Sequence, residues 1–296
     1  MNPLIQFKRI SLPLLIVTVL VCFALLPEAH GVTPAPDGGY ANGNTAEGLN
    51  ALLSLTTGQF NTALGLNTLK FDTTGGFNTA VGVQALFHNN GSSNAAVGVN
   101  ALFSNTNGEQ NIAVGQGALA SNSTGSGNTA SGYQALNKNS TGNGNTAFGW
   151  QALFFNRNGA RNNAFGTDAL STNTSGNDNI AIGSSALENN DDGNDNTAVG
   201  PVALFWSSGD NGNTAVGFGA LSMLGVPIEV GGPGSFNIAL GDSAGSNLES
   251  GSHNMYIGNQ GDFAESNAIR IGDVQTAAFI AGVRGRTTKT RMPYQW

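Results

Sequence analysis

The sequence predicts an all-β fold, a β-solenoid or β-roll of about thirteen coils with one copy of a seventeen-residue repeat in each. Three observations predict it: a short repeat of nearly constant length, a glycine at one place in every copy, and many asparagine and threonine residues, which are poor helix formers. The repeat reads Asn-Thr-Ala-Val-Gly-x-x-Ala-Leu-x-x-Asn-x-x-Gly-x-x, and residues 145–161 are one copy. A repeat this short cannot bury its own apolar face, so the copies must stack on one another.

The opening asparagine fixes the register of the repeat. It stands at Asn44, Asn61, Asn78, Asn94, Asn111, Asn128, Asn145, Asn162, Asn179, Asn196, Asn213, Asn237 and Asn254. The difference between successive numbers is seventeen in ten of the twelve intervals, sixteen in one and twenty-four in one. Asparagine, threonine and glycine disfavour helices, which argues for coils of two short strands and two turns. Coils stacked at about 4.8 Å give a rod of roughly 60 Å.

Each column of the repeat has an expected structural role. The Val column (Leu64, Val114, Phe148 and equivalents) and the Leu column (Leu136, Leu153 and equivalents) are expected to form the dry core together. The small Ala column permits close approach of the opposite strand or of a neighbouring chain. The Gly column suits turns with positive φ. The Asn column suits a ladder in which each amide bonds the copies above and below.

The ends of the chain differ from the repeats. Lys8 and Arg9 precede an apolar run from 12 to 26, which is typical of a secretory signal peptide, and a retained membrane anchor is the alternative. Cleavage after residue 31 would remove Cys22, the only cysteine, and with it any disulfide or thiolate metal site. The expected divisions are a signal peptide helix (1–31), a flexible lead-in (32–43), the repeat domain (44–268) with an insertion (222–236), and a terminal strand or cap with an irregular basic tail (269–296).

The charge of the repeat body limits its partners. Residues 32–269 contain 16 acidic and 4 basic side chains, a net charge of −12. Such a surface repels phosphates, so nucleic acid is not an expected partner. It suits a soluble extracellular protein.

The motif Asn-Thr-Ala-Val-Gly-x-x-Ala-Leu resembles the head repeats of trimeric autotransporter adhesins. It is also similar to the heads of secreted bacterial and phage-tail-fibre proteins that carry an endosialidase-type chaperone domain. Residues 268–283 resemble the segment that precedes that chaperone. The resemblance implies a left-handed β-roll, three chains side by side, and a surface or fibre role. Neither the autotransporter membrane anchor nor the chaperone is recognised in this sequence, which leaves a truncated fibre protein as an alternative.

The sequence shows no catalytic set, and we expect no enzyme and no cofactor. His88 and His253 stand far apart in repeat number, and no serine keeps a fixed offset from either. Asp191, Asp192 and Asp195 contain enough oxygen atoms for Ca²⁺, but they occupy turn positions that other copies fill with Asn, Ser or Thr. We therefore favour a turn role for them and keep calcium as the weaker alternative.

Two rows of aromatic residues are the candidate interface or stacking residues. They are Phe87, Phe103, Phe154 and Phe205 after the column Leu, and Tyr133 and Trp150 after the column Gly. Alternation along the backbone turns the first row away from the core. Exposed on a monomer, these rows form larger apolar patches than soluble monomers usually carry. We expect other copies of the chain to cover them, and a carbohydrate-stacking stripe is the alternative.

The sequence thus predicts a non-enzymatic structural or adhesive head, secreted or displayed on a cell surface. We expect a homotrimer that binds a surface receptor or glycan by multivalent contact, with no integral membrane segment after cleavage. The alternatives are a solenoid module that binds glycan or, less favoured, ice, and a polysaccharide-degrading spike. Ice binding requires a regular threonine face, which Ile112, Asn163 and Ile180 interrupt.

Overall fold

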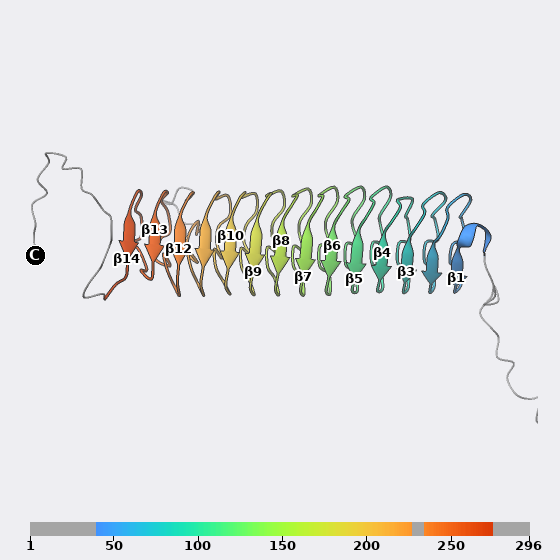
Figure 1. Cartoon of the computed structure of the whole chain (residues 1–296), viewed down its shortest axis with the longest axis horizontal. Helices are drawn as coiled ribbons and strands as arrows, with labels where there is room; N and C mark the ends of the chain where they lie inside the picture. The colour runs from blue at the N-terminus through green and yellow to red at the C-terminus, as the bar shows by residue number, and fades with distance from the viewer. Residues whose placement is uncertain (1–39, 227–233, 275–296) are drawn as a thin grey trace, which may run out of the picture.

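The computed structural model describes residues 40–226 and 234–274, which form a long straight rod (Figure 1). Fourteen three-residue strands lie in one parallel sheet, in the order of the sequence. A short 3-10 turn, η1 (Ala41–Gly43), precedes them. The expected all-β solenoid of about thirteen seventeen-residue coils is confirmed. The expected signal peptide, the lead-in before residue 40, the middle of the insertion and the basic tail lie outside the described residues.

The strands are β1 (Thr45–Glu47), β2 (Thr62–Leu64), β3 (Thr79–Val81), β4 (Ala95–Val97), β5 (Ile112–Val114), β6 (Thr129–Ser131), β7 (Thr146–Phe148), β8 (Asn163–Phe165), β9 (Ile180–Ile182), β10 (Thr197–Val199), β11 (Thr214–Val216), β12 (Ile238–Leu240), β13 (Met255–Ile257) and β14 (Ile269–Ile271). Equivalent residues pair in every ladder, as Ala130 does with Ala147. The register survives the longest interval between repeats, because Ala215 pairs with Ala239 across the insertion. The insertion therefore leaves the stack of coils unbroken.

Each described coil contains one strand, so the expected second strand is wrong. The rest of the coil is a series of tight turns whose backbone groups bond the neighbouring coils. Leu136 N–H donates to Ala152 O at 3.0 Å, and Gln151 N–H donates to Tyr133 O at 3.0 Å. Left-handed residues follow the strand at short intervals and prevent a second extended segment. Stacking satisfies the buried backbone groups without it.

The core consists of two alanine columns and the Leu column. In the coil that begins at Asn128, Ala130, Ala135 and Leu136 are all 0% exposed. The prediction that the Val column lies in the core is wrong: Val114 is 43% exposed and Phe148 is 42% exposed. Side chains alternate along a strand, so an inward alanine at the centre of three residues turns both neighbours outward. Only a small side chain fits at this position in most coils, because the interior is narrow.

The column leucines adopt a left-handed backbone conformation, with φ between 48° and 53° from Leu52 to Leu221. This conformation costs about 1–2 kcal/mol for a residue other than glycine. Burying a leucine side chain contributes about 1.5–3 kcal/mol, and the turn also aligns the backbone for bonding between coils. Burial therefore outweighs the strain.

The predicted asparagine ladder is confirmed. Asn145 Oδ1 accepts the N–H of Asn162 at 3.0 Å, and its Nδ2 donates to Gly159 O at 2.8 Å and to Asn128 Oδ1 at 3.2 Å. The second asparagine of the motif forms another buried ladder, in which Asn139 Nδ2 donates to Asn122 Oδ1 at 2.7 Å. The two ladders fix two corners of each coil.

The C-terminal end of the rod is closed by a departure from the repeat. Gly245 stands where other coils have the column leucine, and the buried ring of Tyr256 fills the vacated space. Tyr256 donates from its hydroxyl to Glu265 at 3.0 Å, and Arg270 forms ion pairs with Glu265 and Asp262. β14 is the last described strand, and the stretch 276–283, which the sequence offers as a final strand, lies outside the described residues.

Candidate functional site

One unusual surface is the outward side of the sheet, which we call the strand face. It consists of the first and third residues of the strands, and from β2 to β14 none of them is charged. Large apolar members are exposed by 36% to 71%: Leu64, Val97, Ile112, Val114, Phe148, Phe165, Ile180, Ile182, Val216, Ile238, Leu240, Ile257, Ile269 and Ile271. The rings of Phe148 and Phe165 stack at 5.4 Å. The strand face is thus an uncharged stripe along the described rod, apolar at the third position of nearly every strand and mostly threonine or isoleucine at the first.

The six predicted aromatic residues lie in two rows, one after the column Leu and one after the column Gly. Phe87, Phe103, Phe154 and Phe205 are half-buried and lie outside the core. Phe87 and Phe103 stack at 5.0 Å with an angle of 4° between their rings, whereas Phe154 and Phe205 each meet a neighbouring ring edge-on.

Tyr133 and Trp150 form the second row. They are 42% and 47% exposed and stack at 6.4 Å. The structure therefore brings the aromatic residues together by row, but not into one site.

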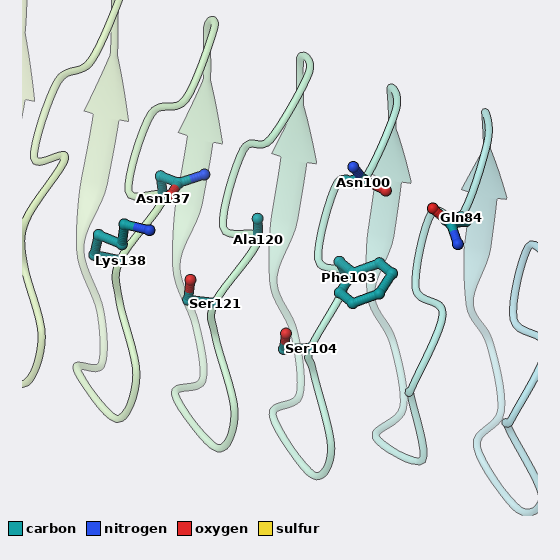
Figure 2. A pocket seen from close by; sticks show the side chains of 8 residues that line it. All are labelled: Gln84, Asn100, Phe103, Ser104, Ala120, Ser121, Asn137 and Lys138. Atoms are coloured by element: carbon teal, nitrogen blue, oxygen red, sulfur yellow. The ribbon is translucent and has the colours of Figure 1, made fainter.

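A notch interrupts the side of the rod between Phe103 and Lys138 (Figure 2). It has a volume of about 280 Å³ and is lined by Gln84, Asn100, Phe103, Ser104, Ala120, Ser121, Asn137 and Lys138. Its cause is the coil that begins at Asn111. There Gly117 replaces the amide and Ala120 the larger side chain that neighbouring coils carry at those positions.

The small side chains change the hydrogen bonding around the notch. Asn137 reaches across to the neighbouring coil and donates from Nδ2 to the backbone Gly117 O at 2.7 Å. Where two neighbouring coils both carry an amide two residues after the column Gly, the amide side chains can bond each other, as Gln151 Nε2 does with Gln134 Oε1 at 3.0 Å. Asn100 faces Gly117 in the next coil, and its buried Oδ1 has no hydrogen-bond partner among the described residues. This amide oxygen is therefore buried beside the notch without a hydrogen-bond partner among the described residues.

The other candidate residues do not form a site. Within residues 40–226 and 234–274, no three His, Cys, Asp or Glu side chains meet as metal ligands, and Asp191, Asp192 and Asp195 are no exception. The Asp191 carboxylate instead accepts from the hydroxyl of Thr174 at 2.5 Å. His88 packs against Phe71 and Phe87, and His253 against Phe236. The described part of the chain contains no helix long and apolar enough to cross a membrane.

A buried carboxylate interrupts the second asparagine ladder next to the insertion. Ser207 stands at a ladder position, and Asp210 occupies the place of a glycine three residues later. Asp210 Oδ1 accepts the N–H of Gly234 at 2.6 Å, but Oδ2 and Ser207 Oγ have no partner among the described residues. Burial raises the pKa of Asp210 to about 6, although the bond from Gly234 opposes the shift.

This shift links stability to pH. Between the ordinary pKa of 3.8 and a folded-state pKa of about 6, the folded chain binds more protons at Asp210 than the unfolded chain. Stability therefore falls as pH rises through that window. The total change is about 3 kcal/mol, since one pKa unit corresponds to about 1.4 kcal/mol.

The fold and these surfaces define a tandem-repeat parallel β-solenoid with an apolar strand face and lateral aromatic rows. Comparison of the chain with protein families, with curated proteins and with solved structures gives no match. The class is thus established by the repeat and the backbone, and the particular role of this solenoid is a matter for proposal.

Sequence reasoning did not find the notch or the buried Asp210. The signals were present as exceptions within columns: Gly117 in a row of amides, Ala120 after a phenylalanine, and Asp210 in a column of glycines. A column predicts the role that its members share, and a single departure from it does not by itself predict a pocket or a buried charge.

Proposed function

We propose that the protein is a non-enzymatic structural or adhesive rod whose strand face packs against further copies of the same chain. The observation that carries the proposal is the uncharged, apolar and exposed strand face from β2 to β14. A face of this length exceeds the apolar patches that soluble monomers usually carry. Its occupant is another coil stack rather than a globular partner, because the face repeats once per coil and only a rod with the same spacing matches it throughout.

We propose three copies per assembly, as the resemblance to trimeric autotransporter adhesin heads implies. In that arrangement the three strand faces meet at the centre and the aromatic rows face outward, so this assembly differs from the sequence-based expectation that other copies cover the aromatic rows. The apolar run near the N-terminus supports secretion, and the acidic repeat body suits an extracellular surface. The rod would then act by multivalent contact with a receptor or glycan, in which avidity replaces a single deep pocket.

The test is the solution mass by light scattering after gel filtration. The wild-type protein is expected to have three times the mass of one chain. Val114→Lys combined with Phe148→Lys places two charges on the strand face and is expected to give a monomer. Thr124→Lys combined with Asn158→Lys adds the same charge to exposed turns of the same two coils and is expected to remain trimeric.

A wild-type monomer would refute the assembly, as would a strand-face variant that remains trimeric. A soluble monomer with an intact fold would favour the alternative of a solenoid that uses a flat face to bind glycan. The stacked pair Tyr133 and Trp150 would then be the first residues to replace.

A further inference from the structure

We propose that the notch between Phe103 and Lys138 is a subsite for one pyranose unit of a saccharide, with a preference for a uronic acid. The notch is independent of the strand face, so this proposal goes beyond assembly of the rod. It rests on three features of the lining: the free side of an aromatic ring, a set of amides and hydroxyls, and one cation with no carboxylate among the lining residues.

The aromatic wall is Phe103. Its ring stacks on Phe87 at 5.0 Å, but the next coil carries Ala120 in place of a third ring. The side of the ring turned away from Phe87 therefore borders the notch (Figure 2). An apolar ring face beside polar groups suits a pyranose, which presents C–H groups on its faces and hydroxyls around its edge. A saccharide ring would take the place that a third phenylalanine would fill.

The polar lining matches the edge of a sugar. Gln84, Asn100 and Asn137 supply amides, and Ser104 and Ser121 supply hydroxyls, each from a known place on four successive coils (Figure 2). Side-chain amides and hydroxyls both donate and accept hydrogen bonds, so the lining can pair with sugar hydroxyls that do the same.

Size and charge narrow the ligand class. The volume of about 280 Å³ lies just below the usual range for small-molecule pockets, which fits one sugar ring rather than a longer buried chain. The eight lining residues include Lys138 but no aspartate or glutamate, although the chain is acidic overall. Lys138 is exposed at the rim, where its ammonium can reach the carboxylate of a uronic acid. Because an exposed ion pair is weak, the preference is expected to be only two- to fivefold.

The test uses methyl glucoside and methyl glucuronide as probes of the full-length protein, with binding measured by saturation-transfer NMR and titration. A single open subsite predicts a dissociation constant on the order of 1 mM for the glucuronide. Ala120→Phe fills the notch with the side chain that other coils carry there and is expected to weaken binding at least tenfold. Glu188→Phe adds the same ring to the same row four coils away and is expected to bind both sugars like the wild type.

Lys138→Gln separates charge from shape. It is expected to bind methyl glucoside unchanged and to lose the preference for the glucuronide. The proposal is overturned if the wild type binds neither sugar at a sugar concentration 20-fold above the expected dissociation constant of about 1 mM. It is also overturned if Ala120→Phe binds like the wild type, or if Glu188→Phe loses binding too. Light scattering of Ala120→Phe distinguishes loss of the notch from loss of the assembly, because the notch lies off the strand face.

Discussion

Replacement of Asn145 tests the contribution of the asparagine ladder, which repeats in every coil. Asn145 is 0% exposed, and its Oδ1 is the acceptor for the N–H of Asn162 at 3.0 Å. In Asn145→Ala that N–H has no side-chain partner, at a cost of about 1–3 kcal/mol. Gly159 O still accepts from Asn156, and Asn128 Oδ1 still accepts the N–H of residue 145, so no second group is orphaned.

The void left by the missing amide adds about 1 kcal/mol, which gives a total near 3 kcal/mol. The free energy of unfolding from urea titration is the first measurement. Hydrogen exchange of the Asn162 amide is the second, and its opening free energy should fall by a similar amount. Because a solenoid is coupled mainly between neighbouring coils, the loss of protection should be largest in the coils on either side of the substitution.

Two variants make this prediction refutable. Asn158 is an exposed turn residue of the same coil, so Asn158→Ala should change stability by no more than about 0.5 kcal/mol. Asn145→Asp keeps the acceptor for the Asn162 N–H but cannot donate to Gly159 O, and a buried carboxylate should destabilise the fold at neutral pH. The reasoning fails if Asn145→Ala is as stable as Asn158→Ala, or if Asn145→Asp matches the wild type.

Four further substitutions test the core, the turns and the buried carboxylate. Leu136→Ala should destabilise by about 2–5 kcal/mol, whereas Val114→Ala should cost less than about 1 kcal/mol in a dissociated rod, as urea midpoints would show. Gly149→Ala should destabilise the fold by at least about 2 kcal/mol and so lower the thermal midpoint, because φ is 141° and the new Cβ meets Gly166 O at 2.4 Å. Asp210→Asn should reduce the fall in stability between pH 4 and 6 without abolishing it, because burial also raises the pKa of Asp72 and Asp168; an unchanged pH profile would exclude a contribution from Asp210.

The strand face links stability to assembly. If three copies pack there, the unfolding midpoint rises with protein concentration, because folded chains are stabilised by mass action. The double variant that combines Val114→Lys with Phe148→Lys should show an unfolding midpoint that does not depend on protein concentration. The concentration dependence is therefore an independent check on the mass measured by light scattering.

The sequence by itself determined the fold class, the length of the coil, the register and one asparagine ladder. The reason is that a constant short period repeats the same local preferences in every coil, and stacking leaves few other ways to bury them. It also indicated that Phe87 and Phe103 lie outside the core, although the alternation used for that prediction does not hold there, because in each coil the segment is a turn in which consecutive residues such as Ala152 and Leu153 are both buried.

Only the tertiary structure decided which apolar column is buried. The sequence offers valine and leucine as equal candidates, but the interior accepts only alanine at the strand and turns Val114 outward. The left-handed conformation of the column leucines likewise could not be predicted from the sequence, because its strain is offset by burial that exists only once the coils stack. The notch arises where Gly117 and Ala120 come to lie between the side chains of Asn100, Phe103 and Asn137. Its shape depends on neighbours a full repeat away along the chain, and no local pattern encodes how such neighbours pack.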